Sequence, residues 1–155
     1  MTFKLSKRSL ERLSAVHPDL VAIVHEAIDI TQYDFGVIEG VRSLARQKDL
    51  VARGLSQTLR SRHLTGHAVD LAGYHRGRLT WDWPAYYMIA DAMIRAAQAL
   101  DTPLRWGGAW HCLDLRDTAL DAETLSSDYI LRKREQGGRP FLDGPHFELP
   151  RAAYP

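Results

Sequence analysis

The sequence predicts a small α+β domain in which a short antiparallel sheet is flanked by helices. Three observations support this fold class. The chain has 155 residues, the size of one ordinary domain. Its 45% hydrophobic and 25% charged residues match a soluble globular protein. Helical patterns fill the first third, and short strand-like segments alternate with helices after it. We therefore expect residues 1–155 to form a single domain, with residues 1–30 as its N-terminal helical portion.

The N-terminal portion is predicted to contain two helices. Residues 4–15 place leucines between basic residues, and Pro18 then marks a boundary. Asp19 is a candidate N-cap for the second helix. The apolar residues that follow it have helical spacing and are Leu20, Val21, Ile23, Val24, Ala27 and Ile28.

The middle of the chain is predicted to alternate strands with a helix. Residues 33–43 carry apolar residues before a turn, which favours a strand that runs into a loop. Residues 43–54 return to a helical pattern that Gly54 can close. At residues 69–71 an acidic residue stands between two apolar ones, as in a strand with one buried face.

The second half is predicted to contain two helices and two short strands. Residues 81–100 form a long helix that Asp82 can cap, and we expect its aromatic residues to pack inside the protein. Strands are predicted at residues 104–106 and 146–150, with a helix over 129–135 between them.

Composition excludes several classes of protein. The net charge of +1, from 20 basic and 19 acidic residues, is too balanced for a dedicated nucleic-acid-binding domain. Cys112 is the only cysteine, so an internal disulfide and a Cys-rich zinc module are excluded. No stretch reaches the roughly 18 apolar residues of a membrane span, and the charged start lacks the apolar segment of a signal peptide. We therefore expect synthesis in the cytoplasm.

Four residues in two short segments carry the candidate chemistry. His63 and Asp70 lie in the first segment, and Asp143 and His146 lie in the second. Two imidazoles and one carboxylate meet the three-ligand count of a catalytic zinc site, which keeps its fourth position for water. The second carboxylate, that of Asp143, could take the proton from that water.

The first segment can bring its two side chains together only through a turn. His63 and Asp70 are seven residues apart, and an odd separation along a strand puts side chains on opposite faces. Gly66 lies between them and permits such a turn. By spacing alone, a pair of this kind is more often a surface or capping pair than a metal site.

The second segment cannot form a regular helix. Gly144 and Pro145 exclude it and predict Asp143 on a turn, with His146 at the mouth of the last strand. Glu148 would share a strand face with His146. It could orient a ligand histidine as a hydrogen-bond acceptor, or it could be a plain exposed glutamate.

Four ordered segments over residues 35–150 strengthen the prediction, because together they argue against chance agreement. They are Gly-Val-Arg-Ser at 40–43 with Gln47, Ser-x-His-x-x-Gly-x-Ala-x-Asp at 61–70, Leu-Arg-Trp-Gly-Gly-x-Trp at 104–110 and Asp-x-Pro-His-Phe-Glu at 143–148. The set resembles the VanY-type zinc peptidases. This family includes D-alanyl-D-alanine carboxypeptidases and dipeptidases, and the L-alanyl-D-glutamate endopeptidases of phage endolysins.

The resemblance implies a role for each matching residue. His63, Asp70 and His146 would hold one zinc ion. Asp143 would act as general base and then as the acid that protonates the leaving amine. Arg42 would stabilise the oxyanion or bind a substrate carboxylate, since its planar fork of donors suits either task.

Substrate contacts are expected from Ser61 and Gln47, and from Trp106 and Trp110, which flank a Gly-Gly turn. Asp143, where the dipeptidase branch tends to carry Glu, and the Trp-Gly-Gly motif favour the endopeptidase branch. The sequence departs from the resemblance in the long interval between Trp110 and Asp143, which leaves the substrate-facing loop open.

The expected function is therefore that of a zinc-dependent peptidoglycan endopeptidase that cleaves the L-alanyl-D-glutamate bond of stem peptides. It would be a monomeric phage or prophage endolysin that reaches the wall through a holin, with the stem peptide as its partner and no nucleic acid. Two alternatives stay open: a D-alanyl-D-alanine carboxypeptidase on the same scaffold, or a non-catalytic zinc-containing wall-binding module. The presence of Asp143 and Arg42 counts against the second, because a binding module needs no base.

Overall fold

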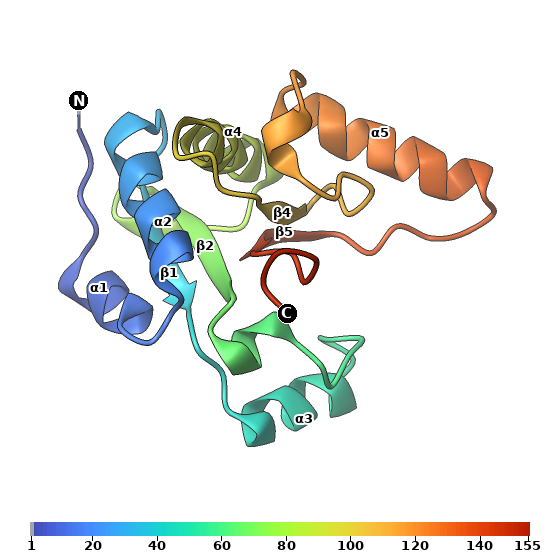
Figure 1. The fold of residues 1–155 in the computed structure, drawn as a ribbon, viewed down its shortest axis with the longest axis horizontal. Coiled ribbons are helices and arrows are strands. Elements are labelled where there is room, and N and C mark those ends of the chain that lie inside the picture. The colour runs from blue at the N-terminus through green and yellow to red at the C-terminus, as the bar shows by residue number, and fades with distance from the viewer. Residues whose placement is uncertain (1) are drawn as a thin grey trace.

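A computed structural model describes residues 2–155 and confirms the predicted α+β fold (Figure 1). One antiparallel sheet has the strand order β1-β2-β5-β4, with β3 paired to β2. The strands are β1 (Phe35–Glu39), β2 (Ala68–His75), β3 (Arg78–Thr80), β4 (Arg105–Gly107) and β5 (Asp143–Glu148). The helices are α1 (Lys7–Leu13), α2 (Pro18–Ile30), α3 (Leu44–Ala52), α4 (Trp83–Ala99) and α5 (Ala122–Glu135), with short 3₁₀ helices η1 (Arg62–Thr65) and η2 (Leu115–Asp117).

The hydrophobic core lies between the sheet and helices α2 and α4. These two helices pack against each other, and α4 also contacts β2 and β5, while α1 lies against β1. The apolar stripe predicted for α2 faces this core, as does that of α4. The largest fully buried apolar side chains are Trp106, Phe35, Phe147, Leu20, Ile23, Leu71, Ile89, Met93, Leu104, Leu115 and Leu149.

Three predicted boundaries are wrong. Helix α2 is capped by His17, whose Nδ1 accepts the backbone N–H of Asp19, so Asp19 lies in the first turn instead of capping it. Helix α5 starts at Ala122, well before the predicted residue 129, because Asp121 caps it. Asp143 begins strand β5 and is not on a turn.

The register of β2 and β5 separates the core from a polar face. Asp70 pairs with His146 across the two strands, and Ala68 pairs with Glu148. Because side chains alternate along a strand, the intervening Val69 and its partner Phe147 point into the core, where both are fully buried. The three polar side chains of this pairing therefore share the opposite face.

An irregular pairing between β4 and β5 positions the start of β5. The register shifts between Trp106 and Gly107, and Gly107 pairs with Asp143. A Cβ atom on Gly107 would collide with the backbone carbonyl of Asp143. Glycine is therefore needed here for the close approach of the two strands.

Among residues 2–155, no helix combines the length and the apolar character that crossing a membrane requires.

Candidate metal centre

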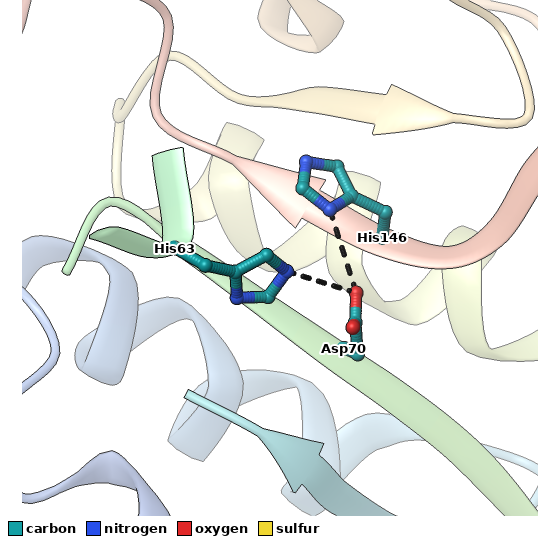
Figure 2. Close-up of side chains that lie close together, drawn as sticks. All are labelled: His63, Asp70 and His146. Atoms are coloured by element: carbon teal, nitrogen blue, oxygen red, sulfur yellow. Dashed lines mark hydrogen bonds and ion pairs between the residues drawn. The ribbon is translucent and has the colours of Figure 1, made fainter. Parts of the chain in front are cut away.

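His63, Asp70 and His146 meet at one edge of the polar face, and all three were predicted as metal ligands (Figure 2). Each comes from a different element: His63 from η1, Asp70 from β2 and His146 from β5. The turn predicted between the first two is present, because η1 ends at Gly66 with a φ of 76°. This left-handed conformation costs glycine little and lets the chain reverse into β2.

The distances from Asp70 to the two histidines fit a small tetrahedral ion, and the ligand atoms of all three residues lie within 4.8 Å of one another. The Oδ1 atom of Asp70 lies 3.2 Å from Nε2 of His63 and 3.4 Å from Nδ1 of His146. Zinc bonds of about 2.0–2.1 Å to nitrogen and oxygen place tetrahedral ligand atoms about 3.3–3.4 Å apart. Two nitrogens and one oxygen also form a donor set that suits zinc. The arrangement can therefore hold a divalent metal ion.

Each histidine makes a hydrogen bond that leaves the correct nitrogen free for a metal. Nδ1 of His63 donates to the carbonyl of Gly40, 2.8 Å away, when Nε2 faces the ion as an acceptor. Nε2 of His146 lies 2.9 Å from Oε1 of Glu148, which leaves Nδ1 toward Asp70. Such outer partners fix the ring orientation and the tautomer. Glu148 thus has the orienting role that the sequence left open against a plain exposed glutamate.

Asp70 and His146 stabilise each other's charge in the metal-free chain. Burial opposes ionisation of Asp70, but the two histidines outweigh it and hold its pKa below the usual value. Burial also disfavours protonated His146, but hydrogen bonds to Asp70 and Glu148 raise its pKa to about 10. A metal ion must therefore displace a proton from His146, so the affinity of the site for the metal ion will rise with pH.

Arg42 is tied to the acidic side of the site. Its guanidinium donates two hydrogen bonds to Glu39, at 2.8 and 2.7 Å, one to Gln47 at 2.7 Å and one to Asp70 at 3.3 Å. An arginine side chain has five N–H groups, so one remains free. Arg42 thus holds Asp70 in place and keeps one donor for a ligand.

Asp143 lies in the same cleft, which has a volume of about 860 Å³. Burial of its carboxyl group, together with the negative charge of Asp70, raises its pKa above the usual value. A carboxylate with a raised pKa is suited to taking up a proton near neutral pH. The cleft therefore brings the candidate base to the candidate metal ligands.

Two of the four predicted substrate contacts do not fit the structure. Trp106 is fully buried in the core, and its Nε1 donates to the backbone carbonyl of Gly144. Gln47 is also fully buried, and its amide group is hydrogen-bonded to Arg42, to Ser56 and to the backbone of residue 58. Both residues hold neighbouring parts of the site in place through hydrogen bonds instead of contacting substrate.

The other two predicted contacts do line the cleft. Ser61 caps η1, since its Oγ accepts the backbone N–H of His63. The ring of Trp110 lies 5.5 Å from that of His146, centre to centre. Their contact with substrate stays a prediction.

Sequence reasoning missed several residues of the cleft. Trp81 was expected to pack inside the protein, but it is 56% exposed and lines the cleft. Glu39 belonged to the predicted turn, but it ends β1 and forms an ion pair with Arg42, which no local sequence pattern indicated. Arg105 lies on β4 and also lines the cleft.

Buried Arg62 connects the C-terminal segment to the metal centre. Its guanidinium donates to the carbonyls of Leu149 and Tyr154, at 3.0 and 2.6 Å from Nη2. Leu149 follows β5 directly, and Arg62 precedes His63 in η1. These hydrogen bonds therefore hold together the two segments that carry the histidines.

Comparison with known proteins places the chain among cell-wall peptidases. Residues 1–150 match the family model of phage L-alanyl-D-glutamate peptidases. The L-alanyl-D-glutamate peptidase of Escherichia phage T5 is 31% identical over 153 residues, which span 96% of this chain and 99% of that protein. The L-alanyl-D-glutamate peptidase of Listeria phage A118 is 30% identical over 113 residues, or 71% of this chain and 39% of that protein.

Solved structures agree with the sequence matches. The crystal structure of the Serratia marcescens L-Ala D-Glu endopeptidase ChiX has a TM-score of 0.74 and 39% identity, and the match covers 100% of this chain and 94% of that one. The vancomycin resistance D,D-dipeptidase VanXYg, solved with a D-Ala-D-Ala phosphinate analogue, has a TM-score of 0.51 and 17% identity over 86% of this chain and 50% of that one. At this identity, the second likeness concerns the fold alone.

Proposed function

Because the chain belongs to the phage L-alanyl-D-glutamate peptidase family and is therefore a peptidase, we propose that it hydrolyses the L-alanyl-D-glutamate bond of peptidoglycan stem peptides with one zinc ion. The observation that carries the proposal is the cluster of His63, Asp70 and His146 beside a free carboxylate in one cleft. A binding protein would need neither the three ligand atoms at this spacing nor a base next to them.

In this proposal His63, Asp70 and His146 hold the zinc ion. When bound, zinc supplies a Lewis acid and a water molecule whose pKa is lowered to about 7. The two outer acceptors, the carbonyl of Gly40 and the carboxylate of Glu148, keep the imidazoles turned toward the ion.

Asp143 transfers the protons. Its carboxylate takes one from the attacking water and returns it to the amine of the D-glutamyl residue as the amide bond breaks. Burial and the nearby charge of Asp70 favour its protonated form, which makes the uptake of the proton from water easier. Arg42 lines the same cleft, and its remaining N–H group stabilises negative charge on the scissile carbonyl oxygen.

The role of Glu148 gives a first testable prediction. In Glu148→Gln, the uncharged amide no longer stabilises the His146 ring as a carboxylate does, so zinc affinity should fall about 10- to 100-fold. Competition with a chromophoric chelator measures this affinity. Glu135→Gln, at the exposed end of α5, is the matched control and should bind zinc like the wild type. An unchanged affinity in Glu148→Gln would remove Glu148 from the metal centre.

Product analysis tests the proposed reaction. We expect digestion of purified peptidoglycan to release stem peptides with new D-glutamyl amino termini, detected by mass spectrometry after amine labelling. Release of free D-alanine would instead identify a carboxypeptidase, and wall binding without any released peptide would identify a binding module. Zinc removal with a chelator should stop the release, and added zinc should restore it.

The phage origin of the two peptidases that resemble this chain supports a lytic role. In this role the enzyme is made inside the host cell and acts on the wall after a holin opens the membrane.

A further inference from the structure

The proposed substrate has an anionic group beside the bond that is cut. A glutamyl residue has two carboxyl groups, and the stem peptide continues through only one of them. The other is left as a free carboxylate within a few bonds of the scissile nitrogen. An enzyme that distinguishes this residue from an uncharged one needs a cation near the metal centre whose donors are not already occupied.

Most arginines of the cleft do not meet this requirement. Arg42 keeps a single free donor, which the proposed mechanism assigns to the scissile carbonyl oxygen, and buried Arg62 is held through its Nε and Nη2 by backbone carbonyls. Arg60 is exposed at the rim, where an arginine is hydrated and loosely oriented, and exposed Arg151 donates from its Nη2 to the backbone carbonyl of Arg60 at 2.6 Å. Arg105 is the remaining arginine of the cleft.

Arg105 is both fixed in direction and short of partners. Its Nη2 donates to the carbonyl of Trp110 at 2.8 Å, and its guanidinium carbon lies 5.2 Å from the centre of the Trp110 ring. Within residues 2–155 no carboxylate lies within ion-pair distance of it, and its Nε is shielded from solvent with no acceptor. A shielded donor without a partner is costly, and an incoming carboxylate would provide the acceptor.

The position of Arg105 is also suitable. Arg105 stands opposite Glu148 in the pairing of β4 with β5. Glu148 is in turn two residues from His146 along β5. Trp110 packs between the two, since its ring touches both the guanidinium of Arg105 and the ring of His146. The nearby carboxylate of Glu148 is already bound to His146 at 2.9 Å. Arg105 is therefore separated from the metal centre by one aromatic ring.

We propose that Arg105, held by Trp110, binds the free carboxylate of the D-glutamyl residue and makes the enzyme selective for that charge. The inference rests on the proposed function. It makes Arg105 a specificity-determining residue, because the contact is made with a group that does not react.

A pair of matched peptides tests this inference. One is an N-acyl-L-Ala-D-Glu peptide with its free carboxylate, and the other carries a carboxamide at that position. We expect the zinc-loaded wild type to have a kcat/KM about 10- to 100-fold higher for the carboxylate, the range of a charge-assisted hydrogen bond. In Arg105→Gln this ratio should fall to near one, through a higher KM for the carboxylate peptide with kcat little changed. Arg105→Lys should keep part of the ratio, because it retains the charge without the fork.

Arg60→Gln is the matched control, an arginine of the same cleft at its exposed rim, and it should keep the wild-type ratio. The ratio compares two substrates on one enzyme sample, so a variant that folds poorly still reports it. An unchanged ratio in Arg105→Gln, or a wild type that cleaves both peptides equally well, would overturn the role of Arg105 and leave the proposed function standing. A wild type that cleaves neither peptide would overturn both.

Discussion

Replacement of His63 by alanine should abolish zinc binding and activity together. Two ligands then remain, because the imidazole that η1 contributes to the metal centre is absent. A bound Lewis acid contributes several kcal/mol to the transition state, and each 1.36 kcal/mol is a factor of ten in rate. We therefore expect less than about a thousandth of the wild-type activity. Metal content by mass spectrometry and peptide release from purified wall measure the two effects.

The side chain of His63 is 1% exposed, so its removal could also affect folding. His63→Gln, which keeps a polar side chain of similar size, separates the two effects when circular dichroism shows the native fold. His25→Ala, an exposed histidine on α2, should retain both zinc and activity. Full activity of His63→Gln without bound zinc would refute the metal mechanism.

Replacement of Asp143 by asparagine should remove turnover while zinc binding and fold remain. Asparagine has nearly the same shape but cannot carry a proton from water to the leaving amine. General acid–base catalysis contributes about 10²- to 10⁴-fold, and kcat should fall by this factor. Loss of a negative charge beside Asp70 should not weaken the zinc ligands. Steady-state kinetics on a labelled peptide, with the zinc content of the same sample, provides the measurement.

Asp29→Asn, on an exposed position of α2, is the matched control for the loss of one carboxylate. It should keep the wild-type kcat. If Asp143→Asn lost its zinc instead, Asp143 would be part of the metal centre, and if it kept its kcat, another group would be the base.

The residues of the metal centre could be predicted from sequence because their chemistry and their spacing agree. His63, Gly66 and Asp70 form a local unit: a histidine, a glycine that turns the chain and a carboxylate on the following strand. The distant His146 could be joined to them only through the resemblance to a zinc peptidase family. Register between β2 and β5 is a property of the folded sheet, and no local pattern encodes that Asp70 faces His146.

The predictions from sequence were wrong where the burial of a side chain depends on segments that are distant in the sequence. Trp106 and Trp110 flank the same Gly-Gly turn, but the first points into the core and the second into the cleft. A tryptophan pattern does not distinguish these directions, because Trp106 takes its face from the pairing of β4 with β5, whereas Trp110 lies beyond the end of β4. The start of α5 was missed for a local reason, since this helix is polar on most sides and has little apolar periodicity.

Because side chains alternate along β5, the enzyme tolerates inserted or deleted residues at some positions of the chain and not at others. A slip of this strand by one residue would turn Phe147 toward the cleft and His146 into the core. The turn at Gly137 and Gly138, by contrast, lies at the far end of α5, and the space around Gly137 is open (Figure 1). A designer who wishes to graft a cell-targeting module into this enzyme can lengthen the chain at that turn, upstream of a strand in which no single residue can be added or removed.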